Sequence, residues 1–250
     1  MADASPSTLG PAGARWPWAG SGHGPLPGLL VALTVLSGVV DAVSYIGLGH
    51  VFVANMTGNI LFLGVALAGE HGLSTFASLA ALAAFLLGAL AGGAIATRVG
   101  EHRGRHLRTA SVVALVPLLI AIAVAAALGQ PVPREARYAL IVPMALAMGI
   151  QNATARRLAV PDLTTTVLTL TLTGIAADSR LAGGPGGHPG RRVTAVAAMF
   201  IGALVGGLLA LHVDLVLPLT IAFLLMGATA VGAHRNSMAR ADWTRRAGSG

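Results

Sequence analysis

The chain has 250 residues, of which 55% are hydrophobic and 10% are charged, and its mean hydropathy is +0.77. A soluble domain needs more charged side chains to cover its surface, so this composition excludes an ordinary soluble fold. The net charge of +7 does not indicate nucleic-acid binding, because the arginines lie in short loops beside apolar runs, where positive charge marks the cytoplasmic side of a membrane protein.

Residues 1–25 are rich in Pro, Gly, Ala and Ser, a composition typical of a disordered tail. Beyond this tail, uncharged runs recur that approach or reach the roughly 20 helical residues needed to cross a bilayer. These runs are 26–40, 74–97, 109–128, 193–211 and 215–233. We therefore predict an all-α, polytopic membrane helix bundle with a single transmembrane domain at 26–233 and a basic cytoplasmic tail at 234–250.

The first run reaches membrane-spanning length only by including Asp41, the one acidic residue well inside an apolar span. A carboxylate at that depth is expected to take a proton or a cation partner, or to be held by neighbouring polar groups. We predict a site that couples to a proton or cation. The alternative is a structural acid that is neutral or bonded to Ser37, Ser44 or Asn152.

A compact polar group follows shortly after this acid. Glycine permits departure from helical geometry, and amide or hydroxyl side chains can then bond the freed backbone groups or a ligand. We predict a discontinuous helix that lines a binding site, and the alternative is a polar helix-packing interface. The residues concerned are Asn55, Thr57, Gly58 and Asn59.

A related passage at 149–174 carries two adjacent amides and then six threonines among residues 164–173. We expect its polar side chains to share one water-filled cavity with Asp41, although threonine hydroxyls also commonly bond preceding carbonyls of their own helix. The predicted substrate or ion site therefore adds Gln151, Asn152, Thr165, Thr166 and Thr169.

The arginines indicate how many segments cross the membrane. Eight full spans would divide them six against ten, with no useful bias. If the Thr-rich segment enters without crossing, nearly all arginines share one side and only Arg134 and Arg137 lie certainly opposite. Because positive charge resists translocation, we predict about six full spans plus two discontinuous or re-entrant segments, with the N- and C-termini in the cytoplasm.

Landmarks recur in the same order in two halves of the chain, 26–128 and 138–233. Asp41 precedes Thr57 by 16 residues, and Asn152 precedes Thr169 by 17. A Gly-Ala-Leu-x-Gly-Gly sequence recurs at 88–93 and 202–207, and Pro-Leu-x-Ile-Ala recurs at 117–121 and 218–222. Three full spans in each half would make an inverted 3+3 repeat, a design that recurs in secondary transporters.

These sequences also resemble those of a known family. The relevant segments are Val-Asp-Ala in the first span, Val-Phe-Val-Ala-Asn-Met-Thr-Gly-Asn at 51–59, Gly-Ile-Gln-Asn-Ala at 149–153, and Thr-Thr-x-Leu-Thr at 165–169. Together they resemble the YoaK-like bacterial membrane family, a domain of unknown function. The resemblance covers roughly 26–233 and implies a multi-pass protein of the bacterial cytoplasmic (inner) membrane, without implying a substrate. Gly174 lies later than in the shorter Thr-Thr-x-Val-Thr-Gly form expected of the family.

The function that we expect is that of a small secondary transporter, with a central polar site for a small-molecule or ion substrate. The alternative is a non-transporting structural or partner-binding membrane protein. Enzyme motifs are absent from the sequence, so we expect neither catalysis nor a cofactor. The lack of cysteine excludes a disulfide or a thiolate metal site. A homodimer formed through a glycine-rich helix face fits the size of the chain.

Overall fold

The computed structural model describes residues 23–160, 168–184, 189–238 and 242–244, and within these ranges all regular secondary structure is helical. The prediction of an all-α fold is thereby confirmed. Short 3₁₀ turns occur at Arg134–Ala136, Arg180–Ala182 and Asp242–Thr244. The α-helices are α1 (Leu26–Gly47), α2 (Met56–Leu67), α3 (Thr75–Val99), α4 (Arg103–Leu128), α5 (Tyr138–Leu158), α6 (Leu168–Ala177), α7 (Pro189–His212) and α8 (Val216–Met238).

Six of these helices are long and apolar enough to cross a membrane, namely α1, α3, α4, α5, α7 and α8. The two others, α2 and α6, are apolar but have only 12 and 10 residues. At about 1.5 Å per residue they reach roughly 15–18 Å, about half the thickness of the hydrocarbon. The predicted six spans with two partial segments are therefore confirmed.

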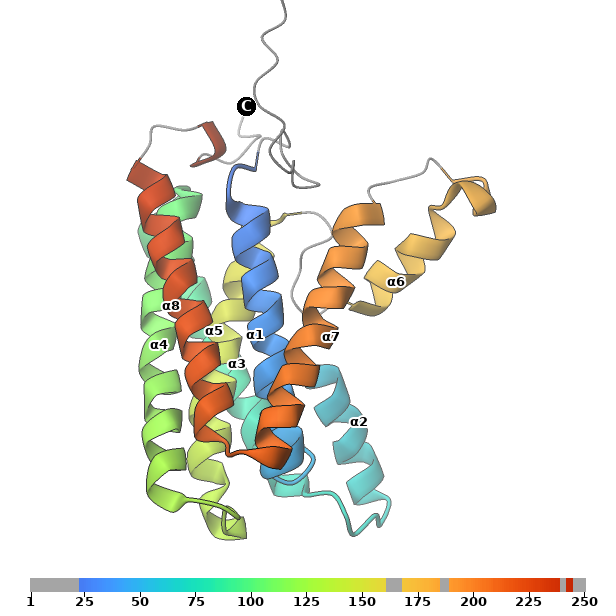
Figure 1. The fold of residues 1–250 in the computed structure, drawn as a ribbon, viewed down its shortest axis with the longest axis vertical. Helices are drawn as coiled ribbons and strands as arrows, with labels where there is room; N and C mark the ends of the chain where they lie inside the picture. The colour runs from blue at the N-terminus through green and yellow to red at the C-terminus, as the bar shows by residue number, and fades with distance from the viewer. Residues whose placement is uncertain (1–22, 161–167, 185–188, 239–241, 245–250) are drawn as a thin grey trace, which may run out of the picture.

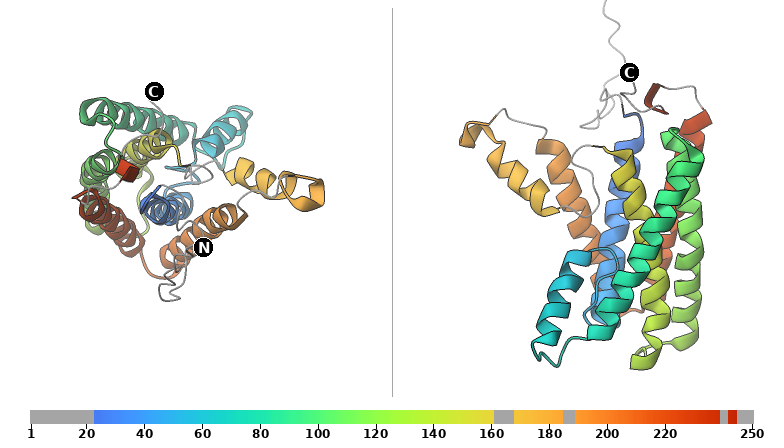
Figure 2. Two further views of the ribbon diagram at one scale, coloured as in Figure 1. Left: turned by 90° about the horizontal axis from the view of Figure 1, so that it is seen from above. Right: turned by 180° about the vertical axis from the view of Figure 1, so that it is seen from behind.

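The helices α1 and α5 occupy the middle of the bundle, and the other long helices surround them (Figure 2). In the most apolar stretches of α1 and α5, 61% and 67% of the residues are buried, against 39% or less in the other four spans. Leucines that point outward from α3 and α7, such as Leu90 and Leu208, are exposed. An apolar outer surface of this kind is expected of a protein whose surroundings are lipid.

The short helices lie at opposite ends of the bundle (Figure 1). The chain leaves α1 at the end far from the C-terminus, turns back into the bundle over residues 48–55, and returns toward the same end along α2. Helix α6 lies near the other end and packs on α7, as α2 packs on α3. Each short helix therefore approaches mid-depth from its own end of the bundle, as expected of a re-entrant segment.

Helix α1 crosses α7 at backbone contact distance. A Cβ placed on Gly38 would clash with the Met199 carbonyl oxygen and lie 2.7 Å from the Ala203 nitrogen. In return, a Cβ on Gly202 would clash with the Val35 carbonyl oxygen. Only glycine permits this approach at these two positions.

Helix α5 crosses α3 in the same manner. A Cβ on Gly149 would clash with the Phe85 carbonyl oxygen and lie 2.8 Å from the Ala89 nitrogen, and one on Gly88 would clash with the Leu146 carbonyl oxygen. At both crossings, the backbone that Gly38 or Gly149 contacts lies three residues before and one residue after the glycine of the partner helix, Gly202 or Gly88. The two crossings therefore have the same register.

Candidate functional site

Asp41 lies in the second half of α1, and only 3% of its surface is exposed. Its Oδ1 accepts hydrogen bonds from the backbone N–H groups of Val53 (2.9 Å) and Ala54 (2.7 Å). Its Oδ2 accepts a third hydrogen bond from the Asn55 side-chain amide (2.5 Å). The carboxylate therefore holds the non-helical segment that leads into α2. Of the predicted structural partners, Ser44 donates to the Asp41 backbone carbonyl (3.1 Å) rather than to its carboxylate.

Asn59 holds the same segment from the other side. It is fully buried in the first turns of α2; its Oδ1 accepts from the Phe52 N–H (2.8 Å) and its Nδ2 donates to the Phe52 carbonyl (2.6 Å). We call Asp41, Asn55, Asn59 and the backbone of 52–54 the Asp41 clamp. The clamp pairs backbone groups that helical geometry would otherwise satisfy, which is the condition for interrupted helices at membrane depth.

Gly58 has a different role from the predicted one, because it does not interrupt the helix. It lies in the first turn of α2, and a Cβ there would come within 2.5 Å of the Phe52 ring. That ring stacks between Tyr45 of α1 and Phe62 of α2, with centroid distances of 5.5 Å to each. The interruption itself spans 48–55, and Gly58 leaves room for the aromatic stack beside it.

Gln151 joins the two central helices. Its side-chain nitrogen donates to the Leu33 carbonyl (3.1 Å) and to the Ser37 hydroxyl (2.9 Å) on α1, and the residue is 3% exposed. Its Oε1 is buried without a hydrogen-bond partner among the described residues. Asn152 is half-buried, and its Nδ2 donates to the Met148 carbonyl within α5 (2.9 Å). The first amide therefore contacts α1, while the Nδ2 of the second donates within its own helix.

The two described threonines of the predicted site, Thr57 and Thr169, lie apart from the clamp's hydrogen bonds. Thr57 and Thr169 are exposed, each at the second position of its short helix, and Thr165 and Thr166 fall outside the described residues. The structure buries one residue in each short helix, Asn59 in α2 and Thr171 in α6. Both lie two residues after the exposed threonine.

The described residues form a cavity at each end of the bundle, and neither of these is the predicted cavity shared by Asp41 and Asn152. One cavity, of about 630 Å³, lies between the C-terminal end of α1 and the starts of α3 and α5. The other, of about 290 Å³, lies between the ends of α3 and α5 and the start of α4. Neither has Asp41 or Asn152 in its wall. Asp41 instead faces the backbone of residues 53 and 54.

A basic cluster lies at the end of the bundle that carries the C-terminus. Arg103 is 8% exposed and donates to the Leu158 carbonyl (2.5 Å), and its Nη1 lies 3.3 Å from His23 Nδ1. Burial lowers the pKa of His23, and the nearby charges of Arg103 and Arg191 lower it further. Neutral His23 is therefore the form that this cluster favours.

Sequence reasoning missed the donors of the clamp and the buried hydroxyl of α6. The backbone of 52–54 carries no side-chain signal, although the Val-Phe-Val-Ala stretch between a helix end and Asn55 is typical of extended structure. An alignment of Thr57 with Thr169 would have identified Thr171, because Asn59 and Thr171 each lie two residues after the aligned threonine.

The comparisons with known proteins agree with the membrane architecture. A model of the family described as "Protein of unknown function (DUF1275)" matches residues 29–232. The chain is 37% identical over 151 residues to the "UPF0700 transmembrane protein YoaK" of Bacillus subtilis (strain 168), a match that covers 60% of this chain and 65% of that protein. No solved structure matches the chain. With the family model matched over the whole helical bundle, the chain belongs to the DUF1275 family of multi-pass membrane proteins.

Proposed function

We propose that the protein is a small secondary transporter, built as an inverted repeat of two halves that exchange access to a central region from opposite faces of the membrane. The observation that carries this proposal is the shared register of the two helix crossings. Gly38 and Gly149 lie three residues before Asp41 and Asn152, and each meets the glycine-rich helix of the other half. A rotation that exchanges the halves relates one crossing to the other.

The short helices support the same relation. Helix α2 packs on α3 and α6 packs on α7, and they approach the bundle from opposite ends (Figure 1). Asn59 and Thr171 are then equivalent positions, since each is the buried residue of its helix. The proline landmark does not support the repeat: Pro117 lies in the middle of α4, whereas Pro218 lies in the first turn of α8.

Asp41 is the proposed coupling group, and its contacts favour a proton over a metal cation. A cation needs free oxygen lone pairs, whereas three N–H donors already point at this carboxylate. The N–H groups of Val53 and Ala54 cannot become acceptors, but the Asn55 amide can rotate to present its oxygen. Proton uptake at Oδ2 therefore changes the Asn55 contact first, and Asn55 is the N-cap residue of α2.

The alternative is a non-transporting membrane protein in which these polar groups only hold helices together. The Asp41 clamp, whose polar groups already have hydrogen-bond partners, favours this alternative, as do the bonds from Gln151 to α1. Hydrogen bonds of this kind hold helices together without a ligand. The two candidates differ in one respect that does not require a known substrate. Alternating access requires the region around α2 to be reached by water from each side of the membrane in turn.

Accessibility of a cysteine at Thr57 tests the proposal, since the native chain contains no cysteine. A membrane-impermeant maleimide is applied to vesicles of each orientation, with Asp41 intact or changed to Asn. We expect T57C to label from both sides, and D41N to change the ratio of the two rates by about tenfold, the equivalent of one charge-assisted hydrogen bond. The matched control is D214N, which alters a half-buried acid at the end of the bundle that caps the Leu217 N–H (2.8 Å). Labelling from one side alone, at equal rates in all variants, contradicts transport.

The arrangement of charge supports a topology with both termini in the cytoplasm. Most arginines of the described chain lie at the ends of α3, α5 and α8 or at the starts of α4 and α7, which share one end of the bundle (Figure 1). Arg134 and Arg137 lie at the other end. We propose that the arginine-rich end faces the cytoplasm of a bacterial cell.

A further inference from the structure

The 630 Å³ cavity lies at the end of the bundle far from the C-terminus and opens between three elements of the chain. Its walls are formed by residue 46 in the last turn of α1, residues 48–50 after it, residues 71–77 before and at the start of α3, and the start of α5. A volume of several hundred Å³ is typical of small-molecule sites. The polar side chains in the walls include His50, His71, Ser74, Thr75, Arg134 and Arg137.

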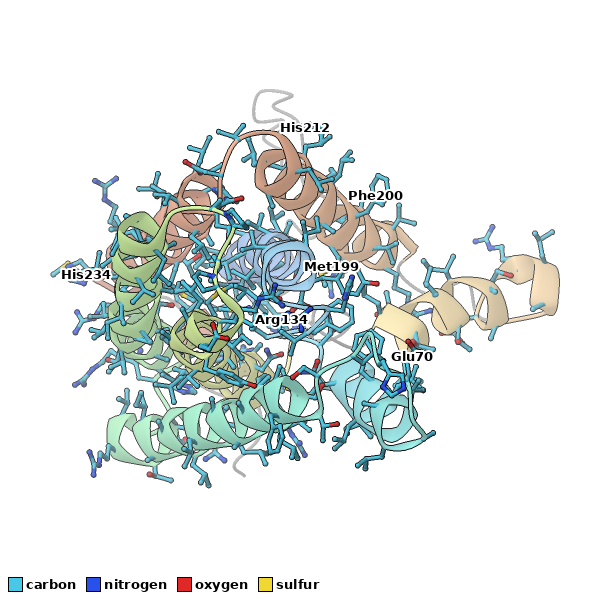
Figure 3. All side chains as sticks on the ribbon, turned by 90° about the horizontal axis from the view of Figure 1, so that it is seen from below. Glu70, Arg134, Met199, Phe200, His212 and His234 are labelled. Atoms are coloured by element: carbon cyan, nitrogen blue, oxygen red, sulfur yellow. The ribbon has the colours of Figure 1, made fainter. Side chains whose placement is uncertain are left out.

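The described residues in the walls of this cavity carry positive charge and include no carboxylate. Figure 3 looks onto this end and shows Arg134 toward the middle of the bundle, with Glu70 beside the end of α2. The Glu70 carboxylate accepts a hydrogen bond from the Gly72 N–H (3.1 Å), and Glu135 is exposed outside the lining. The two arginines form no ion pair with any described residue. An anion entering the cavity therefore meets two uncompensated guanidinium groups.

The Arg137 guanidinium lies against the backbone at Gly49. Its Nη1 would lie 2.7 Å from a Cβ on Gly49, whose φ of +93° also favours glycine. Its Nε is buried without a hydrogen-bond partner among the described residues. A buried donor without a partner is costly, so the Arg137 side chain has hydrogen-bonding capacity that the described residues do not use.

Two helix N-termini add to the positive potential. Helix α3 begins at Thr75 after its N-cap Ser74, whose hydroxyl accepts from the Ala77 N–H (3.2 Å), and α5 begins at Tyr138. Both starts form part of the cavity wall. The unpaired N–H groups and the macrodipole at such positions favour an anionic group.

We propose that this cavity binds a small oxyanion, a phosphate or carboxylate group, between Arg137 and Arg134. The group comes either from a soluble anion or from the headgroup of an anionic lipid, since the cavity lies at an end of the bundle, where headgroups lie. Guanidinium groups suit both sources, because their paired N–H donors match two oxygens of the same anion. This binding does not require alternating access, so its test is independent of the transport proposal.

The test measures thermal unfolding of the full chain in detergent, with sodium phosphate titrated at constant ionic strength. A ligand that binds only the folded state raises the unfolding temperature with concentration. We expect phosphate to raise it, and R137Q and R134Q to weaken apparent binding at least tenfold. The control is R235Q, which removes an exposed arginine at the opposite end of the bundle. Because Arg134 is exposed, R134Q keeps the test valid even where R137Q lowers stability by itself.

A second arm separates the two sources of the anion. The same variants are placed in nanodiscs of phosphatidylcholine alone or with phosphatidylglycerol, and their unfolding temperatures are compared. Stabilisation by phosphate that depends on Arg134 and Arg137 supports a soluble oxyanion. Stabilisation by phosphatidylglycerol alone, with the same dependence, supports a lipid headgroup in the same site. Stabilisation by neither, or equal stabilisation of R134Q, R137Q and R235Q, overturns the proposal.

Discussion

At the scale of single residues, the Asp41 clamp explains how a polar, non-helical segment is held inside a membrane bundle. Backbone N–H and C=O groups at this depth have no water to bond, and each unpaired group costs free energy. Asp41 accepts from two of these groups, and Asn59 both accepts from and donates to Phe52. A carboxylate can only accept hydrogen bonds, so the N–H and C=O groups of Phe52 together require an amide side chain, which both accepts and donates.

We expect N59A to lower the free energy of unfolding by about 2–4 kcal/mol, because it removes the partner of both backbone polar groups of Phe52, which are part-buried. The measurement is chemical or thermal unfolding in detergent. The matched control is N236A, since Asn236 also donates to a backbone carbonyl, that of Gly232 (2.7 Å), but at an exposed position. Equal losses in the two variants would show that the Asn59 contacts do not stabilise the segment.

At the scale of helices, the close crossings of α1 with α7 and of α5 with α3 set the geometry of the core. Lipid offers little hydrophobic drive for helices to associate, so close backbone packing has a large share in their contact. Gly38 and Gly149 each lie against the backbone of the partner helix. A methyl group at either position would push the two helices apart.

We expect G38A and G149A to destabilise the protein by similar amounts, about 1–3 kcal/mol each, because an overpacked contact forces backbone shifts. Gly93 and Gly227 serve as controls, since a Cβ on either would meet nothing within 4 Å. At those positions alanine is expected to be neutral or slightly stabilising, because it favours the helix. Unfolding midpoints of the four variants decide the matter. A large loss in G38A without one in G149A would argue against equivalent crossings.

At the scale of the whole molecule, whether the two short helices cross decides the orientation of the three helices between them, α3, α4 and α5. With six crossings, the end of α6 and the end of α8 share one face, and the end of α2 lies on the other. Eight crossings would instead place all three of these ends on one face. The number of spans therefore has a direct consequence for which loops face the cytoplasm.

Single cysteines in the cysteine-free chain test this topology. We expect A182C and N236C to react with an impermeant maleimide from the cytoplasmic side, and A68C to react from the opposite side, since all three positions are exposed. Labelling is measured in intact cells and in inverted vesicles. Reaction of A68C and A182C from the same side would mean that the segment containing α6 crosses fully, because α3, α4, α5 and α6 would then make an even number of crossings between them.

Particular residues show which parts of the site were predictable. Asp41, Asn55 and Asn59 were selected because polar groups at membrane depth are costly, and the structure gathers all three in the clamp. Their partners were not predictable, because Phe52, Val53 and Ala54 act through the backbone. Gln151 was predicted as a ligand-site amide, and the structure adds that its side-chain nitrogen donates to α1. This contact was not predictable, since a helical pattern does not tell which neighbour a polar side chain meets.

Composition, apolar run length and arginine placement were enough to determine an all-helical membrane protein with six spans and two partial segments. These properties follow from the bilayer itself, which imposes length and polarity on each segment separately. Which groups Asp41 bonds, how closely α1 approaches α7, and which cations share a cavity were decided only by tertiary structure. The physical reason is that each of these features depends on the distance between segments that are far apart in the chain. Rotating a helix about its axis by one residue would change which groups its side chains contact, without changing the hydropathy of the helix.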